Sequence, residues 1–203
     1  MFLVLIFEYL PYIIIFVMKR LFDLSLLIFV FIILILPMAV TAFLVRLTSK
    51  GPVLHWSKRV GLNNKIFLMP KFRSMKIGTP QLATHLMKNP ESQLTPIGNF
   101  IRRSSLDELP QLFSVLNNDM SFVGPRPALF NQDDLITLRT AVNVHTIKPG
   151  ITGWAQVNGR DELPIPIKVK FDQDYLTRMN LFFDLKIIFL TAKKVLFKDN
   201  ISH

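Results

Sequence analysis

Residues 24–45, LSLLIFVFIILILPMAVTAFLV, contain no charged side chain. At a helical rise of ~1.5 Å per residue, this run is long enough to cross the ~30 Å hydrocarbon core of a bilayer. The sequence before it lacks the basic start of a secretory signal peptide, and no pair of small residues marks a cleavage site. We therefore predict a membrane helix, with the buried core helix of a soluble protein as the alternative.

Basic residues flank this run on both sides. Lys19 and Arg20 precede it, and Arg46 and Lys50 follow it. Because cytoplasmic flanks carry the excess of Lys and Arg, both flanks are expected in the cytoplasm, which a straight crossing cannot achieve. Pro37 removes a helical hydrogen bond and kinks the helix, so the chain could dip into one leaflet and return. We predict a proline-kinked, re-entrant membrane helix over residues 18–47.

The rest of the chain divides into an apolar N-terminal extension, residues 1–17, and a cytoplasmic domain of residues 48–203. For the extension three roles stay open: an interfacial helix, a second span, or residues upstream of a start at Met18. The whole chain has a net charge of +10 and is 50% hydrophobic, which suits a protein that lies on an anionic membrane or handles phosphates. The absence of cysteine excludes a disulfide framework, a thiol nucleophile and a Cys-ligated zinc site.

Hydrophobic spacing and turn residues outline the elements of the domain. In chain order these are a hairpin of residues 53–56 and 66–69 around Gly61–Asn64, a loop over 78–93, one helix from Ile97 and another ending at Leu116, a helix over Asp133–Arg139, a loop over 148–154, and an amphipathic helix over Leu181–Lys198. The last helix could lie at a membrane interface or pack as ordinary core.

The segment most suggestive of chemistry is RRSSLDE, residues 102–108. Ser105 and Glu108 have the spacing of a capping box, which predicts that a helix begins at Leu106. Asp107 would then lie in the first turn, where the helix dipole and the two arginines favour an ionised carboxylate and a bound phosphate. Such an aspartate can attack phosphorus, ligate Mg²⁺, or do both. The alternative is a capping residue without a catalytic role.

Cationic side chains on stiff backbone are candidates for binding phosphate. Arg126 lies between two prolines, and Arg160 follows an Asn-Gly turn. Lys71 and Arg73 alternate around a phenylalanine, so they would share one face of a strand. Arg102 joins them because it lies shortly upstream of the acidic pair. Each could alone be a solvated surface charge, whereas together around one carboxylate pair they would form a phosphate site.

Other motifs are weak. Asp172 and Asp174 have a spacing that can hold a metal–nucleotide, but such triplets are common, and the four histidines lack metal-ligand spacing. The sequence contains neither a GxGxxG nor a P-loop motif, so neither type of nucleotide site is indicated. The basic residues are dispersed, and together with the membrane helix this argues against a nucleic-acid partner.

Longer motifs follow one another along the chain. They are Lys19-Arg20-x-x-Asp23, Gly51-Pro52, Arg59-Val60-Gly61, Lys71-Phe72-Arg73-Ser74-Met75, residues 103–112, residues 119–127, residues 148–160, Asp172-x-x-Tyr175 and Asp184-Leu185-Lys186. In these motifs the chain resembles the bacterial sugar transferases, monotopic phosphoglycosyl transferases that initiate glycan assembly, from about Met18 to Leu196. It departs from the family pattern at Ser57, Asn118, Arg178 and Asn180.

The resemblance implies a small α/β domain with interfacial amphipathic helices and a re-entrant membrane helix. It implies transfer of a phosphosugar from a UDP-sugar to polyprenol (undecaprenyl) phosphate, with Mg²⁺ as cofactor and UMP as the released product. Asp107 would be the nucleophile that forms a phosphosugar–enzyme intermediate and a ligand of the metal, with Glu108 as its partner. Lys71, Arg73, Arg102, Arg126 and Arg160 would bind the nucleotide-sugar diphosphate.

The same resemblance places the protein in the bacterial inner membrane, with its domain on the cytoplasmic face and in contact with lipid. Two other functions stay open: a non-catalytic membrane adaptor of a glycan-assembly complex, and a direct glycosyl transferase that releases UDP. The sugar, the pathway and the formation of a homo-oligomer are also left open.

Overall fold

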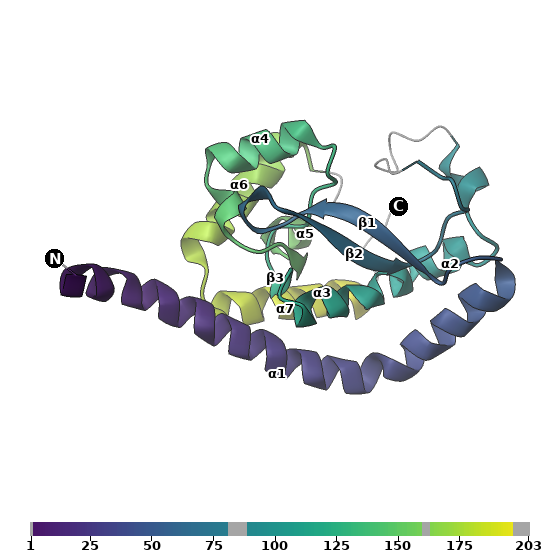
Figure 1. Ribbon diagram of the computed structural model, residues 1–203, viewed down its shortest axis with the longest axis horizontal. Helices are drawn as coiled ribbons and strands as arrows, with labels where there is room; N and C mark the ends of the chain where they lie inside the picture. The colour runs from purple at the N-terminus through teal and green to yellow at the C-terminus, as the bar shows by residue number, and fades with distance from the viewer. Residues whose placement is uncertain (1, 81–88, 160–162, 197–203) are drawn as a thin grey trace.

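One long helix runs along the base of the molecule, and a mixed domain of short helices and strands sits on it (Figure 1). The computed structural model describes residues 2–80, 89–159 and 163–196. The elements are α1 (Phe2–Thr48), β1 (Leu54–Val60), η1 (Leu62–Asn64), β2 (Ile66–Phe72), η3 (Pro90–Gln93), α2 (Gly98–Arg103), η4 (Leu106–Gln111), α3 (Leu112–Leu116), β3 (Ser121–Val123), α4 (Asp133–Ala141), η5 (Val144–Thr146), β4 (Gly150–Thr152), α5 (Trp154–Val157), α6 (Ile165–Arg178) and α7 (Leu181–Leu196), where η marks a 3₁₀ helix. This mixture agrees with the expected α/β class.

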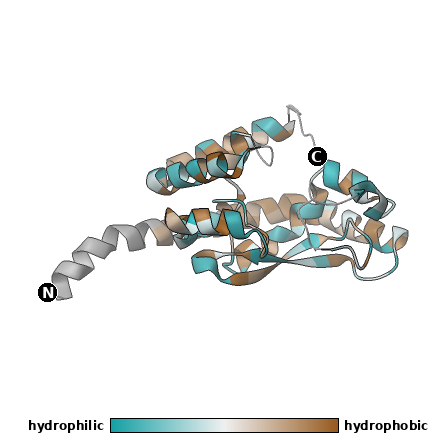
Figure 2. Ribbon diagram, turned by 90° about the horizontal axis from the view of Figure 1, so that it is seen from above, coloured by the Kyte–Doolittle hydropathy of each residue, from teal (hydrophilic) through white to brown (hydrophobic). Residues whose placement is uncertain are grey.

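Helix α1 is continuous from Phe2 to Thr48 and crosses residues 17 and 18 without a break. Within the described residues, Phe16–Thr48 is long and apolar enough to span a membrane, and only 11% of its most apolar window is buried. The core helix of a soluble protein would be mostly buried. Figure 1 shows α1 changing direction beneath the domain, and Figure 2 colours the ribbon of α1 by residue hydropathy, largely in the apolar range outside its grey part.

The N-terminal half of α1 is fastened to the domain by a buried polar cluster. Lys19 Nζ donates to Asp184 Oδ2 on α7 at 2.5 Å and to the Tyr175 hydroxyl on α6 at 3.0 Å. The Tyr175 hydroxyl in turn donates to Asp184 Oδ1 at 2.7 Å. Three helices thus meet at one ion pair that is almost closed to solvent.

The neighbouring residues of α1 bond to the backbone of the domain. Arg20 donates to the carbonyls of Val115 and Leu116 at 2.7 and 2.9 Å, which occupies acceptors at the end of α3. Asp23 Oδ1 accepts from the Ser121 hydroxyl at 3.0 Å and from the backbone N–H of Phe122 at 3.1 Å. The basic residues before the apolar run therefore hold α1 against the domain.

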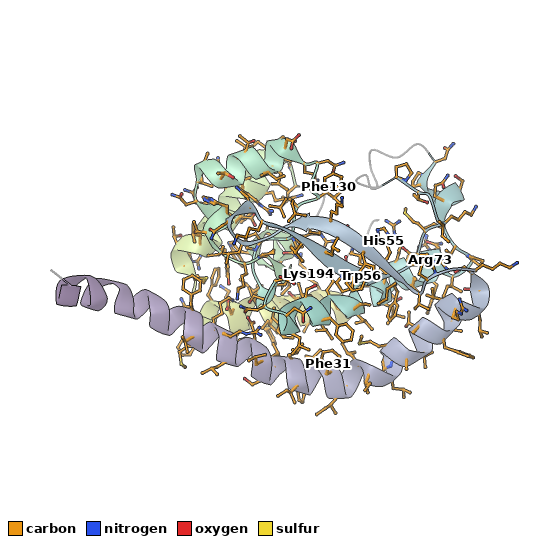
Figure 3. All side chains as sticks on the ribbon, viewed as in Figure 1. Phe31, His55, Trp56, Arg73, Phe130 and Lys194 are labelled. Atoms are coloured by element: carbon orange, nitrogen blue, oxygen red, sulfur yellow. The ribbon has the colours of Figure 1, made fainter. Side chains whose placement is uncertain are left out.

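The C-terminal end of α1 is fastened to the same domain at a second point. Arg73, which follows β2, donates to the carbonyl of Lys50 at 2.7 Å and to the carbonyl and hydroxyl of Ser49 at 3.0 and 2.7 Å. Val45 packs with Phe72 in a small core beside these bonds. Figure 3 shows Arg73 near the end of α1.

The strands form two small sheets. β1 and β2 pair antiparallel with His55 opposite Lys71, which confirms the predicted hairpin. β3 and β4 pair in parallel, so part of the predicted loop 148–154 is a strand instead. The two backbones approach so closely that a Cβ at Gly150 would lie 2.1 Å from the amide nitrogen of Gly124. The Pro and Gly residues of this segment predicted a loop, whereas strand β4 forms because it pairs with β3, which lies far away in the sequence.

The Asp-x-Asp triplet lies on α6 and is engaged in protein contacts. Asp172 is buried in an ion pair with Arg139 on α4 at 2.6 Å. Asp174 accepts from the Trp154 indole at 2.8 Å and from Arg178 at 2.9 Å. These contacts use the two carboxylates to pack helices, which leaves the metal–nucleotide interpretation without support.

Candidate active site

The segment with Asp107 and Glu108 is the 3₁₀ helix η4 rather than a capped α-helix. Ser105 has a φ of 56° and its side chain makes no capping hydrogen bond. Pro110 lies inside the segment, where its ring and missing N–H disfavour α-helix. The predicted capping box is therefore wrong, although the helical segment does begin at Leu106.

Glu108 is bound by two cations from different parts of the fold. Its Oε1 accepts from Lys71 Nζ on β2 at 2.7 Å and from Arg126 Nη2, in the loop after β3, at 3.0 Å. Burial acts to raise the pKa of Glu108, but the charges of Arg126 and Lys71 and their hydrogen bonds outweigh it and hold the pKa well below its usual value. Glu108 is therefore ionised at neutral pH and holds both cations in place.

Asp107 is the less engaged member of the pair. It is 9% exposed, and no donor in the described part of the chain bonds to its carboxylate. Burial raises its pKa to about 6 against the opposing charge of Lys71, with the Glu108 carboxylate adding to the rise and Arg102 and Arg126 opposing it. At neutral pH it is mostly ionised, so its oxygens can attack or coordinate.

Three of the five predicted phosphate-binding cations gather at this pair. Lys71, Arg102 and Arg126 all lie close enough to lower the pKa of Asp107. Arg73 instead has its guanidinium against Ser49 and Lys50 at the end of α1. Arg160 lies outside the described residues.

Sequence reasoning missed the arginines that hold the backbone beside Arg126. Arg139 Nη1 donates to the carbonyl of Arg126 at 2.8 Å, and Arg59 Nη1 donates to the carbonyl of Pro127 at 3.0 Å. Arg139 lies on the predicted helix 133–139 and has the pattern of a surface cation. Only its burial beside Asp172 distinguishes it, and no local sequence signal indicates that burial.

The donor set fits a magnesium ion that is shared with a substrate. Within the described ranges no group of three or more His, Asp or Glu side chains could hold a metal. Mg²⁺ is often held by one or two carboxylates together with substrate phosphates and water. Asp107 offers such a carboxylate, to which no side chain of the described ranges donates, next to cations that would attract phosphates.

Comparison with known proteins gives a consistent result. The family model described as "Bacterial sugar transferase" matches residues 14–198. The chain is 46% identical over 164 residues to the UDP-glucose:undecaprenyl-phosphate glucose-1-phosphate transferase of Xanthomonas campestris pv. campestris, covering 75% of this chain and 33% of that protein. It is 42% identical over 161 residues to the protein of the same name in Escherichia coli (strain K12), covering 75% and 34%.

A relative of similar length is also found. The uncharacterized sugar transferase EpsL of Bacillus subtilis (strain 168) is 42% identical over 186 residues, which covers 92% of this chain and 91% of that protein. By contrast, the chain spans about one third of the length of the Xanthomonas and Escherichia relatives.

Proposed function

The chain belongs to the bacterial sugar transferase family, and from this membership we propose that it transfers a phosphosugar from a UDP-sugar to undecaprenyl phosphate and releases UMP. The names of the Xanthomonas and Escherichia relatives give this donor class and this acceptor. The proposal extends their activity to a chain that shares about one third of their length.

The observation that carries the proposal is that the two adjacent carboxylates, Asp107 and Glu108, differ in their hydrogen-bond partners. Glu108 is neutralised by Lys71 and Arg126, whereas Asp107 has no bonded donor among the described side chains. A carboxylate that is buried, ionised and unbonded, with cations beside it, suits attack on phosphorus in a bound diphosphate. Asp107 is thus the nucleophile, and Glu108 orients the two cations.

The reaction takes two displacements at one phosphorus atom. An oxygen of Asp107 bonds to the phosphorus that bears the sugar, and the bond from this phosphorus to UMP breaks. A phosphate oxygen of the polyprenol then bonds to the same phosphorus and releases Asp107 as a free carboxylate. Lys71, Arg102 and Arg126 offset the negative charge that builds up on the phosphate oxygens.

A magnesium ion would bind at Asp107 together with the donor phosphates. When bound, it would withdraw charge from the phosphate oxygens and stabilise the leaving UMP. Asp107 would bring the acidic ligand, and Lys71 and Arg126, held by Glu108, would orient the other phosphate oxygens.

The contacts at the two ends of α1 support a re-entrant helix. Lys19 and Arg20 bond to α6, α7 and α3, and the backbone of Ser49 and Lys50 bonds to Arg73 of the same domain. One domain cannot lie on both sides of a bilayer, so both ends of the apolar run lie on one side. Pro37 lies between these ends, where its ring would kink the helix, and Thr41 Oγ1 donates to the Pro37 carbonyl at 2.8 Å.

Exposed apolar side chains on the domain support its seating on the membrane surface. On α7, Phe182, Leu185 and Phe189 are exposed, and on α3, which packs against α1, Phe113 and Leu116 are exposed. Such side chains enter the boundary between headgroups and acyl chains. The domain would lie on the cytoplasmic face of the bacterial inner membrane, where its acceptor phosphate can meet Asp107.

The test is nucleotide release from the membrane-embedded chain, with a panel of UDP-sugars, undecaprenyl phosphate and Mg²⁺. We expect UMP with at least one donor, and no UMP from Asp107→Asn at equal expression and membrane content. Asp133→Asn, an exposed aspartate on α4, is the matched control and should keep wild-type release. Release of UDP, or unchanged release by Asp107→Asn, would contradict the proposed reaction.

A further inference from the structure

The loop that carries Arg126 is held by its carbonyl groups. Pro125 and Pro127 lack N–H groups, so the loop can make few backbone bonds of its own. Four consecutive carbonyls, those of residues 125–128, each accept one bond from outside the loop. The donors in order are the N–H of Gly150 at 2.9 Å, Arg139 Nη1 at 2.8 Å, Arg59 Nη1 at 3.0 Å and the N–H of Val60 at 3.0 Å.

Arg139 donates to this loop from helix α4, which packs against helix α6. Its guanidinium is buried, and it also donates from Nε and Nη2 to Asp172 Oδ2 at 2.9 and 2.6 Å. The planar guanidinium thus spans a carboxylate on α6 and the carbonyl of the residue that contacts Glu108. The two bonds to Asp172 fix the orientation of the Arg139 guanidinium, and its third bond fixes the position of the Arg126 carbonyl.

A purely structural role would not require this pair. Buried ion pairs lose much of their attraction to desolvation, and well-packed apolar residues often replace them without loss of stability. What apolar residues cannot replace is the third bond, from Arg139 Nη1 to the backbone of the active-site loop.

We propose that Arg139, oriented by Asp172, is a positioning residue that fixes the Arg126 backbone and thereby sets where the Arg126 guanidinium meets Glu108 and the donor phosphates. The inference rests on the proposed function for its consequence in catalysis. Its geometric part, the restraint of the loop, stands apart from any activity.

The test uses the full chain in lipid nanodiscs and the double variant Arg139→Met/Asp172→Leu, which removes both charges and keeps apolar volume. Asp174→Asn, on the same helix and in an exposed ion pair, is the matched control. A milder variant, Arg139→Lys, keeps the charge but loses the planar fork and should change each readout in the same direction by less. Thermal midpoints establish first that each variant is folded.

The first readout is amide hydrogen exchange in peptides that cover residues 124–129. We expect exchange there to be several-fold faster in the double variant and unchanged in Asp174→Asn. Wild-type exchange in a folded double variant would overturn the proposal. This readout decides the restraint of the loop even if the wild-type chain releases no UMP, an outcome that would defeat the proposed function alone.

The second readout is the separate measurement of kcat and KM for UMP release with the donor selected from the panel. Displacement of Arg126 should lower kcat/KM about tenfold, because small misplacements of binding groups are costly in catalysis. The loss should appear mainly as a higher KM for the UDP-sugar, because the displaced guanidinium is the group that would meet the donor phosphates. A stable double variant with the wild-type kcat and KM would exclude positioning as the role of the pair.

Discussion

At the scale of single residues, Asp107 and Glu108 are adjacent in the chain, but their pKa values shift in opposite directions. Two cations bond to Glu108, whereas burial dominates at Asp107. A nucleophile must be ionised, so kcat/KM for UMP release should fall as the pH drops through about 6, the pKa of Asp107. Lys71 is the strongest charge that opposes this rise, and Lys71→Met should therefore lower activity and shift the acid limb to higher pH.

The pH–rate profiles of the wild type and Lys71→Met, measured with saturating acceptor, check this expectation. Lys65→Met, an exposed lysine on the same hairpin, is the control and should leave the acid limb in place. An acid limb that stays at the same pH in Lys71→Met would show that the limb does not report the ionisation of Asp107.

Because burial raises the pKa of Asp107, its ionised carboxylate should destabilise the folded state. The unfolded chain has an Asp pKa near 3.8 and the folded chain one of about 6, so the folded state binds the proton more tightly. This contribution favours folding fully below pH 4 and is lost as the pH rises through 6. Asp107→Asn should thus be more stable than the wild type at pH 8, by up to about 3 kcal/mol, and equally stable near pH 4.

Thermal unfolding of both proteins in nanodiscs across this pH range measures the difference. A gap that grows toward acid pH would show that the sign of the shift at Asp107 is wrong. Asp133→Asn again serves as the control, because its exposed carboxyl should leave the stability difference flat with pH.

At the scale of elements, the docking of α1 on β3 depends on Asp23. Its carboxylate accepts from a hydroxyl and a backbone N–H and is 3% exposed. Asp23→Ala would leave both donors buried without an acceptor, which costs about 2–3 kcal/mol. We expect a fall in thermal midpoint of about 5 °C or more in nanodiscs. Ser25→Ala, an exposed position on the same helix, should change the midpoint little, and equal midpoints for the two variants would contradict this role of Asp23.

At the scale of the whole molecule, the two fastenings of α1 predict its topology. The chain has no cysteine, so single cysteines at Met18 and Lys50, both exposed, report on the two ends of the apolar run. A membrane-impermeant maleimide should label both in inverted vesicles and neither in intact cells. Labelling of the two positions from opposite sides would establish a straight crossing and overturn the re-entrant helix.

Local pattern was enough to predict several parts of this protein. The apolar run, the hairpin, the helical segment that begins at Leu106 and the presence of Arg102 near Asp107 follow from spacing, turn residues and neighbouring charge. These features depend on interactions between residues close in sequence. The family motifs added the reaction class, which composition alone did not indicate.

Tertiary packing decided the features that depend on distant partners. It bound Glu108 to two cations and left Asp107 without a donor among the described side chains. It placed Arg73 at the end of α1, and it used Lys19 and Arg20 to dock that helix rather than only to flank a membrane segment. It also buried Arg139 against Asp172, more than thirty residues away. The physical reason is common to all four: the energy of a charged side chain depends on burial and on which partner reaches it, and both are set only when distant segments pack together.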